Sequence, residues 1–316
     1  MNQLLSISIP VYERVDSFRA NIPKILEYSM GLDIPVYILD DSKSHDIRDV
    51  CSNLKENFDN LFYIRNERTL GHDKNFITSL LVGDSEYIWV LGDRVALKEG
   101  CLETVLAAIN GSGCDIISVN KLNRNIDFSS GQYKDPSEVL QKFGWHLTYT
   151  GATIYSKRVI AKLQDCNLDR SKNFPQIALI FNYLSIDCSF YWVNERLIQA
   201  VASSQSYWLN NALSVFIGDW EAAVLNLPDI YQLSLKRQTI LAHSKNTRLF
   251  SIRLLLKLRE SGGYDYEVLT NFRARLIEHS GIPYFLLYIL SVYPQWILSL
   301  FRVLIKFVYR KELIYK

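Results

Sequence analysis

Short apolar runs and longer segments of helical periodicity alternate along the first 120 residues of the chain. Five of the runs are rich in β-branched and aromatic residues and have the length of buried strands. The segments between them repeat apolar residues every three or four positions, as amphipathic helices do. The pattern predicts strands at 5–11, 35–39, 61–64, 87–91 and 115–119, and helices at 17–29, 45–57, 73–82 and 99–109.

This alternation predicts an α/β domain with a mostly parallel sheet, because strand–helix–strand units are joined by right-handed crossovers that place helices on the sheet faces. Ligands of such sheets bind outside the carboxyl ends of the strands. The loops that follow the strands are therefore where binding and catalytic side chains are expected.

The pattern changes in the second half of the chain. Residues 121–150 are polar and irregular, a strand is expected at 151–156, and a helix begins near Phe174. A pair of strands is expected at 189–193 and 197–202, and the pattern beyond Trp208 is helical. We therefore divide the chain into an α/β domain, 1–205, and a helical C-terminal region, 206–316.

Composition narrows the classes of protein that fit. With 316 residues and 48% hydrophobic content the chain can bury a large core, and its net charge of only +2 argues against a nucleic-acid binder. The charge is uneven: residues 236–316 hold 14 basic and 5 acidic residues, a net of +9, whereas residues 1–235 have a net of −7. This asymmetry predicts contact with an anionic surface at one end. The five cysteines form no CxxC pair, so reduced thiols in a cytosolic compartment are expected.

Polar loops follow the first four predicted strands, and their order and spacing are more specific than any one of them. The first strand runs into Pro10-Val11-Tyr12-Glu13-Arg14 and the second into Asp40-Asp41-Ser42. The third is followed by the stretch from Arg65 to Asn75, and the fourth by Gly92-Asp93-Arg94.

These loops resemble those of the family 2 glycosyltransferases of the GT-A fold, well over residues 4–120 and loosely over 145–205. The resemblance is closest to bacterial enzymes that extend capsule, O-antigen or similar lipid-linked glycans. It implies a Rossmann-like, mostly parallel sheet with flanking helices. It also implies inverting transfer of a sugar from a nucleotide donor, UDP-linked by expectation, to a hydroxyl of a lipid-linked glycan.

The resemblance also assigns the donor site. It implies that the base and ribose are held by Pro10, Tyr12, Glu13, Asp40 and Asp41. It places Asn66, Gly71, Lys74 and Asn75 near the nucleotide and its phosphates. Turn formation is the alternative role for the two aspartates, and a solvated surface charge is the alternative for the lysine.

Two parts of the family pattern are altered. The acidic run that holds Mn²⁺ or Mg²⁺ in the family is reduced here to Asp93, and Arg94 follows it. Three interpretations stay open: a weak metal site on Asp93, metal-free action with Arg94 as counter-charge to the diphosphate, or an inactive site. The last would make the chain a degenerate, non-catalytic subunit that serves as a membrane-bound scaffold or partner of an active glycosyltransferase.

The second altered part is the catalytic base. The family often places an aspartate where the helix after the acceptor strand begins, but this chain reads Lys172-Asn173-Phe174-Pro175-Gln176 there. Asp169 is the nearest upstream candidate, Asp187 and Asp219 are more distant, and a surface loop position is the alternative for Asp169. Three aromatic residues precede the acceptor strand: Trp145, His146 and Tyr149. They are either a platform for a sugar ring or part of the core.

The C-terminal region carries a membrane signal. No charged residue occurs from Ser280 to Phe301, although two prolines argue against a simple span. From 297 to 308, apolar residues fall on one helical face, and Arg302, Lys306 and Arg310 fall opposite them. We expect peripheral or monotopic attachment to the cytoplasmic face of the plasma (inner) membrane, with a polyprenyl-diphosphate-linked glycan as acceptor. Packing of this face on the chain itself or in a homo-oligomer is the alternative.

Overall fold

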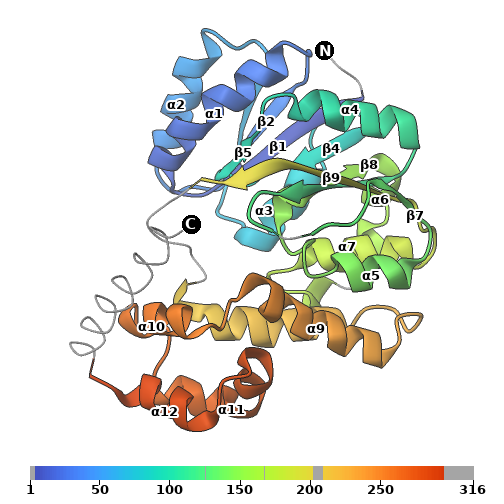
Figure 1. Ribbon diagram of the computed structural model, residues 1–316. Helices are drawn as coiled ribbons and strands as arrows, with labels where there is room; N and C mark the ends of the chain where they lie inside the picture. The colour runs from blue at the N-terminus through green and yellow to red at the C-terminus, as the bar shows by residue number, and fades with distance from the viewer. Residues whose placement is uncertain (1–3, 125, 167, 202–208, 295–316) are drawn as a thin grey trace, which may run out of the picture. The chain divides into compact units, whose positions relative to one another are not determined.

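The computed structural model describes residues 4–124, 126–166, 168–201 and 209–294 (Figure 1). The chain forms two compact units: residues 1–204 with 222–240 make the first, and residues 205–221 with 241–316 make the second. The domain boundary predicted at 205/206 falls within 202–208, outside the described residues. Residues 222–240 belong to the first unit although they follow that boundary.

A nine-stranded sheet forms the centre of the first unit, in the order β3-β2-β1-β4-β8-β6-β9-β5, with β7 paired to β9. The first four strands are parallel, as predicted, and β6 is parallel to β9. The other pairs are antiparallel, so the prediction of a mostly parallel sheet is wrong beyond β4. The strands are β1 (Leu5–Val11), β2 (Val36–Asp40), β3 (Leu61–Arg65), β4 (Tyr87–Val90), β5 (Val95–Leu97), β6 (Ile116–Lys121), β7 (Gly131–Tyr133), β8 (Thr153–Ser156) and β9 (Phe190–Ala200).

The second half of the sheet is mixed because β8 runs antiparallel to both of its neighbours, β4 and β6. β8 begins beside the carboxyl end of β4 and runs back along it, with Ile154 opposite Trp89 and Ser156 opposite Tyr87. The strand pair expected at 189–202 is one strand, β9. Shifts in its register with β6 on either side of Asn120 accommodate the polar residues that suggested a break.

Helices cover both faces of this sheet, with α1, α2 and α4 on one face and α3, α5 and α7 on the other (Figure 1). The strand and helix residues that meet on the first face are mostly apolar, among them Ile7, Ile38, Phe18 and Val105. The polar stretch 121–150 contains β7 and α5, which sequence patterning missed; Asp135 caps α5 by accepting from the Ser137 N–H. The helices are α1 (Val15–Met30), α2 (Asp46–Lys55), α3 (His72–Leu80), α4 (Cys101–Ser112), α5 (Pro136–Phe143), α6 (Lys157–Ile160) and α7 (Pro175–Leu184).

The second unit is helical, as predicted, and has an apolar core of its own that includes Leu213, Phe250, Leu258, Tyr264 and Leu276. Its helices are α10 (Ile252–Glu260), α11 (Tyr266–Ser280) and α12 (Tyr284–Val292), while α8 (Trp220–Leu225) and α9 (Leu233–Thr247) contain residues of both units. Within the described ranges, no helix combines the length and apolarity needed to cross a membrane. The amphipathic helix predicted at 297–308 lies outside those ranges.

Candidate active site

The loops singled out in the sequence meet at one edge of the sheet. β1 pairs with β2 on one side and β4 on the other, both in parallel, so the strand order reverses between β1 and β4. Such a reversal opens a crevice at the carboxyl ends of the strands, where open α/β sheets bind ligands. The residues that follow β1, β2 and β4 all lie at this edge.

Asp41 holds the loop after β2 to the loop after β3. Its side chain is buried, and its two carboxylate oxygens accept three hydrogen bonds: from Asn66 Nδ2 (2.8 Å), Leu70 N–H (2.7 Å) and Gly71 N–H (2.9 Å). Its own N–H donates to the Val11 carbonyl at the end of β1 (3.0 Å). The Asp41 carboxylate therefore fixes the loop after β3 to the loop after β2, and the Asp41 backbone N–H joins the latter to the end of β1.

Asp40 and Glu13 are also engaged with neighbouring protein groups. Asp40 is fully buried; one of its oxygens accepts from the Ser42 N–H (2.9 Å) and the other from the Tyr63 hydroxyl (2.7 Å). Glu13 Oε1 accepts from the Lys43 N–H (2.7 Å). The turn role that was the alternative for Asp40 is therefore present. Contact of either carboxylate with a nucleotide stays a prediction.

The phosphate-side residues divide into buried and exposed members. Asn66 Nδ2 also donates to Asn75 Oδ1 (3.0 Å), and Asn75 is buried at the start of α3. Gly71 precedes α3 with φ +85°, a left-handed conformation that favours glycine. Lys74 is exposed in the first turn of α3, where the helix dipole adds to its attraction for an anion. Tyr12 has 42% of its surface exposed beside the same edge, and Pro10 is partly buried.

Asp93 is paired with a residue that sequence reasoning missed. Arg14 Nε lies 3.1 Å from Asp93 Oδ2, and the two side chains are 34% and 4% exposed. The Asn21 amide of α1 donates to the Asp93 and Val95 carbonyls (3.3 and 2.8 Å), which fixes the loop after β4 to α1. Arg14 stands next to Glu13 in the loop already identified. The parallel pairing of β1 with β4 brings it beside Asp93.

Arg94 completes a group of alternating charges. Burial raises the pKa of the Asp93 carboxyl, and the positive charges of Arg14 and Arg94 oppose that shift. Burial also lowers the pKa of Arg94, and the nearby Arg14 charge lowers it further. Two guanidiniums thus share one carboxylate at the switch point, which leaves a local excess of positive charge.

The residues around Asp93 do not fit a divalent metal site. No group of three or more His, Cys, Asp or Glu side chains that could hold a metal occurs in the described ranges. The single carboxylate is already paired with Arg14. A divalent cation about 4 Å from a guanidinium would be repelled by roughly 8 kcal/mol at an effective dielectric constant of about 20. The Mn²⁺ or Mg²⁺ predicted at Asp93 therefore conflicts with the positive charge that the structure places beside this carboxylate.

The three aspartates predicted as candidate bases lie in different parts of the fold. Asp169 lies exposed in a short 3₁₀ turn, Leu168–Arg170. The segment that follows it contacts the start of α3, where the Asn173 N–H donates to Asp73 Oδ2 (2.9 Å). Asp187 lies near the amino end of β9, opposite the switch point. Asp219 belongs to the second unit.

His146, one of the three aromatic residues before β8, is a core residue. It is fully buried, its Nε2 lies 2.9 Å from the Val119 carbonyl, and its Nδ1 lies 3.3 Å from Arg124 Nη1. Burial and the Arg124 charge hold the pKa of His146 well below its usual value, so the ring is neutral. Both ring nitrogens have partners, which leaves His146 no role as a base.

Trp145 and Tyr149 pack with cations rather than with each other. The Arg124 guanidinium lies over both rings, 5.1 Å from the Trp145 centroid and 5.7 Å from that of Tyr149. Lys121 Nζ lies 4.9 Å from the Tyr149 centroid. Trp145 is 5% exposed. The core role expected as the alternative therefore accounts for Trp145, and an acceptor platform stays a prediction.

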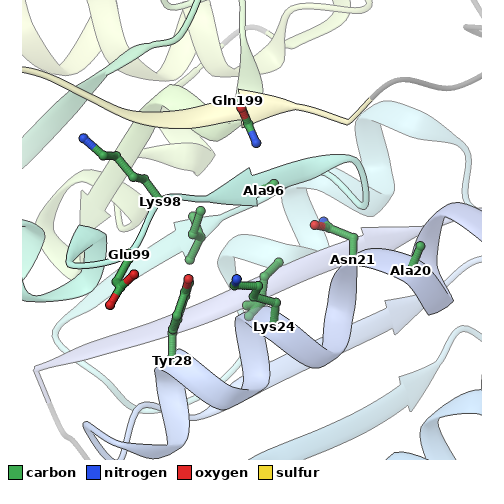
Figure 2. Close-up of a pocket in the computed structure, with 10 residues that line it drawn as sticks. Ala20, Asn21, Lys24, Tyr28, Ala96, Lys98, Glu99 and Gln199 are labelled. Atoms are coloured by element: carbon green, nitrogen blue, oxygen red, sulfur yellow. The ribbon is translucent and has the colours of Figure 1, made fainter.

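A pocket of about 360 Å³ lies between α1 and β5. Figure 2 shows Lys24 and Tyr28 of α1 facing Lys98, Glu99 and Gln199 across it. The pocket contains none of the predicted nucleotide-binding residues. It is therefore separate from the predicted nucleotide-binding residues.

Comparison with known proteins agrees with the fold and the loops. Residues 6–161 match the family model of glycosyl transferase family 2. The chain therefore carries a family 2 glycosyltransferase domain over these residues. Among characterised proteins, abequosyltransferase RfbV of Salmonella typhimurium is 24% identical over 135 residues, which cover 39% of this chain and 40% of the relative. The match thus spans less than half of the relative's length.

Two solved structures share the fold. TarS 1–349 of S. aureus has a TM-score of 0.56 and 14% identity, covering 88% of this chain and 89% of that one, and it has also been solved with UDP-GlcNAc. The mannosyltransferase PcManGT from Pyrobaculum calidifontis, in complex with GDP-Man and Mn²⁺, has a TM-score of 0.57 and 11% identity, covering 89% and 87%. At these identities the likeness establishes the GT-A-like fold alone.

Proposed function

We propose that this chain is an inverting glycosyltransferase that moves a sugar from a nucleotide donor, UDP-linked by preference, to a hydroxyl of a lipid-linked glycan in surface polysaccharide synthesis. The observation that carries the proposal is the Asp41 network, which joins the loops after β1, β2 and β3 at the switch point. Relatives that bind UDP-GlcNAc and GDP-Man support a nucleotide-sugar donor. The named relative, an abequosyltransferase, supports sugar transfer.

The proposed reaction is a single displacement at the anomeric carbon. The acceptor hydroxyl oxygen bonds to that carbon as the bond to the β-phosphate oxygen breaks. The electron pair of the broken bond stays with the nucleoside diphosphate, and the hydroxyl proton passes to a carboxylate base or to water. Positive groups beside the diphosphate stabilise the charge that it gains, which is the main way that a protein accelerates such a transfer.

A row of exposed apolar side chains on α12 supports a lipid-linked acceptor. Phe285, Tyr288, Ile289 and Val292 are 61%, 42%, 42% and 43% exposed. Their spacing of three, four and seven residues places them on one face of the helix. A stripe of exposed apolar and aromatic residues is typical of a helix that lies in a membrane interface. We propose that this stripe helps to hold the enzyme on the cytoplasmic face of the membrane.

The first experiment measures release of nucleoside diphosphate by the full-length chain in detergent, from a panel of UDP-, GDP- and dTDP-sugars, with a polyprenyl-diphosphate-linked glycan as acceptor. We expect one donor to be consumed, and Asp41→Asn to lower the rate at least about 30-fold because the donor loops lose their common anchor. Asp127→Asn, an exposed loop position, is the matched control. Absence of transfer from every donor would contradict the proposal.

The Arg14–Asp93 ion pair is the observation that favours the alternative function, a non-catalytic GT-A subunit that acts as a membrane-bound scaffold or partner of an active glycosyltransferase. In that case the carboxylate only stabilises the fold. Asp93→Ala separates the two functions, because an enzyme would lose turnover whereas a scaffold would keep its association with the partner.

The membrane proposal is tested with vesicles of phosphatidylglycerol and phosphatidylethanolamine in a flotation assay. Phe285→Ser/Ile289→Ser should float less than the unaltered chain, since each buried apolar side chain contributes about 1.5–3 kcal/mol. The control is Ile186→Ser, which removes a 74% exposed apolar side chain of the first unit. Equal flotation of the three proteins would exclude α12 as the contact.

A further inference from the structure

Arg14 lies where a donor's diphosphate is expected. It follows β1, and Asp93 follows β4, so their ion pair spans the reversal in strand order. Asp93 is the buried member of the pair and Arg14 the accessible one. The carboxylate therefore anchors a partly exposed guanidinium, whereas in a metal site the carboxylate itself would have to reach the ligand.

The backbone before Arg14 is shaped to hold it there. Glu13 has φ +56°, a left-handed conformation that is uncommon for a residue with a side chain. Its N–H donates to Ser42 Oγ (2.9 Å), and its carboxylate accepts from the Lys43 N–H (2.7 Å). The loop after β2 thus maintains a strained turn whose effect is to direct Arg14 towards Asp93.

The hydrogen-bonding capacity of this pair is only partly used. Arg14 contacts Asp93 through Nε, and within the described ranges no hydrogen-bond partner is found for its Nη1 and Nη2. Asp93 Oδ2 is buried, and in the same ranges it accepts no hydrogen bond of good geometry. A guanidinium with two available nitrogens presents the fork that binds phosphate oxygens.

More positive charge surrounds the pair. Arg94 lies close enough to Arg14 for the two charges to affect each other. Tyr149 lies close enough to Arg94 and Asp93 for both charges to affect its pKa, and the Lys121 and Arg124 cations lie over its ring. Arg14, Arg94, Lys121 and Arg124 thus lie around one buried carboxylate, Asp93, and Glu13 places a second carboxylate next to Arg14 in the chain. Such a cluster attracts a diphosphate and repels a divalent cation.

We propose that Arg14, together with Arg94, supplies the counter-charge to the donor's diphosphate, so that this chain binds its donor without a divalent metal. The inference rests on the proposed function, because it assumes a nucleotide-sugar donor. Arg14 would bind diphosphate oxygens through Nη1 and Nη2 while Asp93 keeps its guanidinium in place. As the bond to the sugar breaks, the electron pair that passes to the β-phosphate oxygen is stabilised by both arginines.

The test measures binding of UDP, UMP and uridine, and of the matching guanosine compounds, to the full-length chain by calorimetry, once in EDTA and once in Mn²⁺. We expect the diphosphate to bind equally well in both. Arg14→Ala should weaken diphosphate binding by about 10- to 100-fold and nucleoside binding by less than twofold. Inorganic pyrophosphate is included to separate nucleotide binding from capture of any diphosphate, such as that of the lipid acceptor.

Three further variants keep the test interpretable. Arg14→Ala leaves the buried Asp93 charge unpaired, and the double variant Arg14→Ala/Asp93→Asn removes that charge. The double variant should therefore keep the fold and still bind diphosphate weakly. Arg14→Lys keeps the charge without the fork and should be intermediate. Arg19→Ala, at an exposed position of α1, should bind as the unaltered chain does.

The outcomes distinguish the inference from the proposed function. Diphosphate binding that requires Mn²⁺, or that Arg14→Ala leaves unchanged, would overturn the inference and leave the glycosyltransferase proposal intact. Binding of pyrophosphate as tightly as of UDP and GDP would also overturn it, since the cluster would then not be a donor site. If none of these nucleotides binds with or without Mn²⁺ and no donor of the panel is consumed, both proposals fail.

Discussion

Asp41→Asn is the most direct test of the structure at the switch point. The substitution keeps the size of the side chain and one oxygen, but it removes the negative charge and replaces the second oxygen with an NH₂ group. Asp41 now accepts from Asn66 Nδ2, Leu70 N–H and Gly71 N–H, all within 2.9 Å. In the variant at least one of these donors faces the new NH₂ group without a partner.

The free energy lost on substitution follows from these three hydrogen bonds. A hydrogen bond to a charged acceptor contributes about 1.5–3 kcal/mol, and leaving a buried donor unpaired costs about 1–3 kcal/mol. One bond is lost, and the others become bonds to a neutral acceptor. Partial access of water to the loop reduces the sum. We therefore expect the free energy that holds the loop closed to fall by about 2–4 kcal/mol.

Hydrogen exchange measures this change locally, which is preferable because a chain of two units need not unfold in one step. Protection of the Leu70 and Gly71 amides should fall at least about 30-fold, and the melting temperature of the first unit by about 4–12 °C. Asp127→Asn should leave both unchanged. If the two variants protect these amides equally, Asp41 does not hold the donor loops together and the reasoning is wrong.

Two further predictions concern stability. Gly83→Ala should destabilise the protein by at least about 1–2 kcal/mol, because Gly83 has φ +75° and a Cβ there would lie 2.8 Å from the Tyr37 ring. Gly111→Ala in α4, where a Cβ would meet no atom within 4 Å, should stabilise it by up to about 1 kcal/mol. Thermal denaturation that shifts the stability of both variants in the same direction would refute this. His146 has a lowered pKa because of burial and Arg124, so below about pH 6.5 only the unfolded chain takes up its proton. Stability should therefore fall as the pH drops from 6.5, by up to about 1.4 kcal/mol per pH unit, and His146→Gln should flatten the slope measured by urea denaturation at several pH values; parallel slopes would contradict it.

Much of the donor half of the molecule was predictable from sequence. β1, β2, β3 and β4 lie within two residues of their predicted ranges, because a strand buried between two helical layers is apolar along its length and its limits are marked by polar loops. The resemblance to family 2 glycosyltransferases rested on those loops and is confirmed by the family match over residues 6–161. The helical character of the C-terminal region was also predictable, since its periodicity is local.

The remainder depended on contacts between distant parts of the chain. Periodicity identifies a strand but not its neighbour or its direction, so neither the antiparallel course of β8 nor the continuity of β9 could be predicted. The same limit applies to the site. Arg14 and Asp93 were both visible in loops of the sequence, but only the pairing of β1 with β4 brings them within 3.1 Å.

Sequence by itself thus determined which residues stand at the ends of the strands, because local polarity and turn chemistry decide where a strand stops. Tertiary structure decided which of them meet, and with what charge. A lone Asp93 after β4 resembles the remnant of a metal site, yet its buried position beside Arg14 makes it the anchor of a cation. That difference arises from electrostatics in a low-dielectric crevice, which only the folded arrangement of the chain creates.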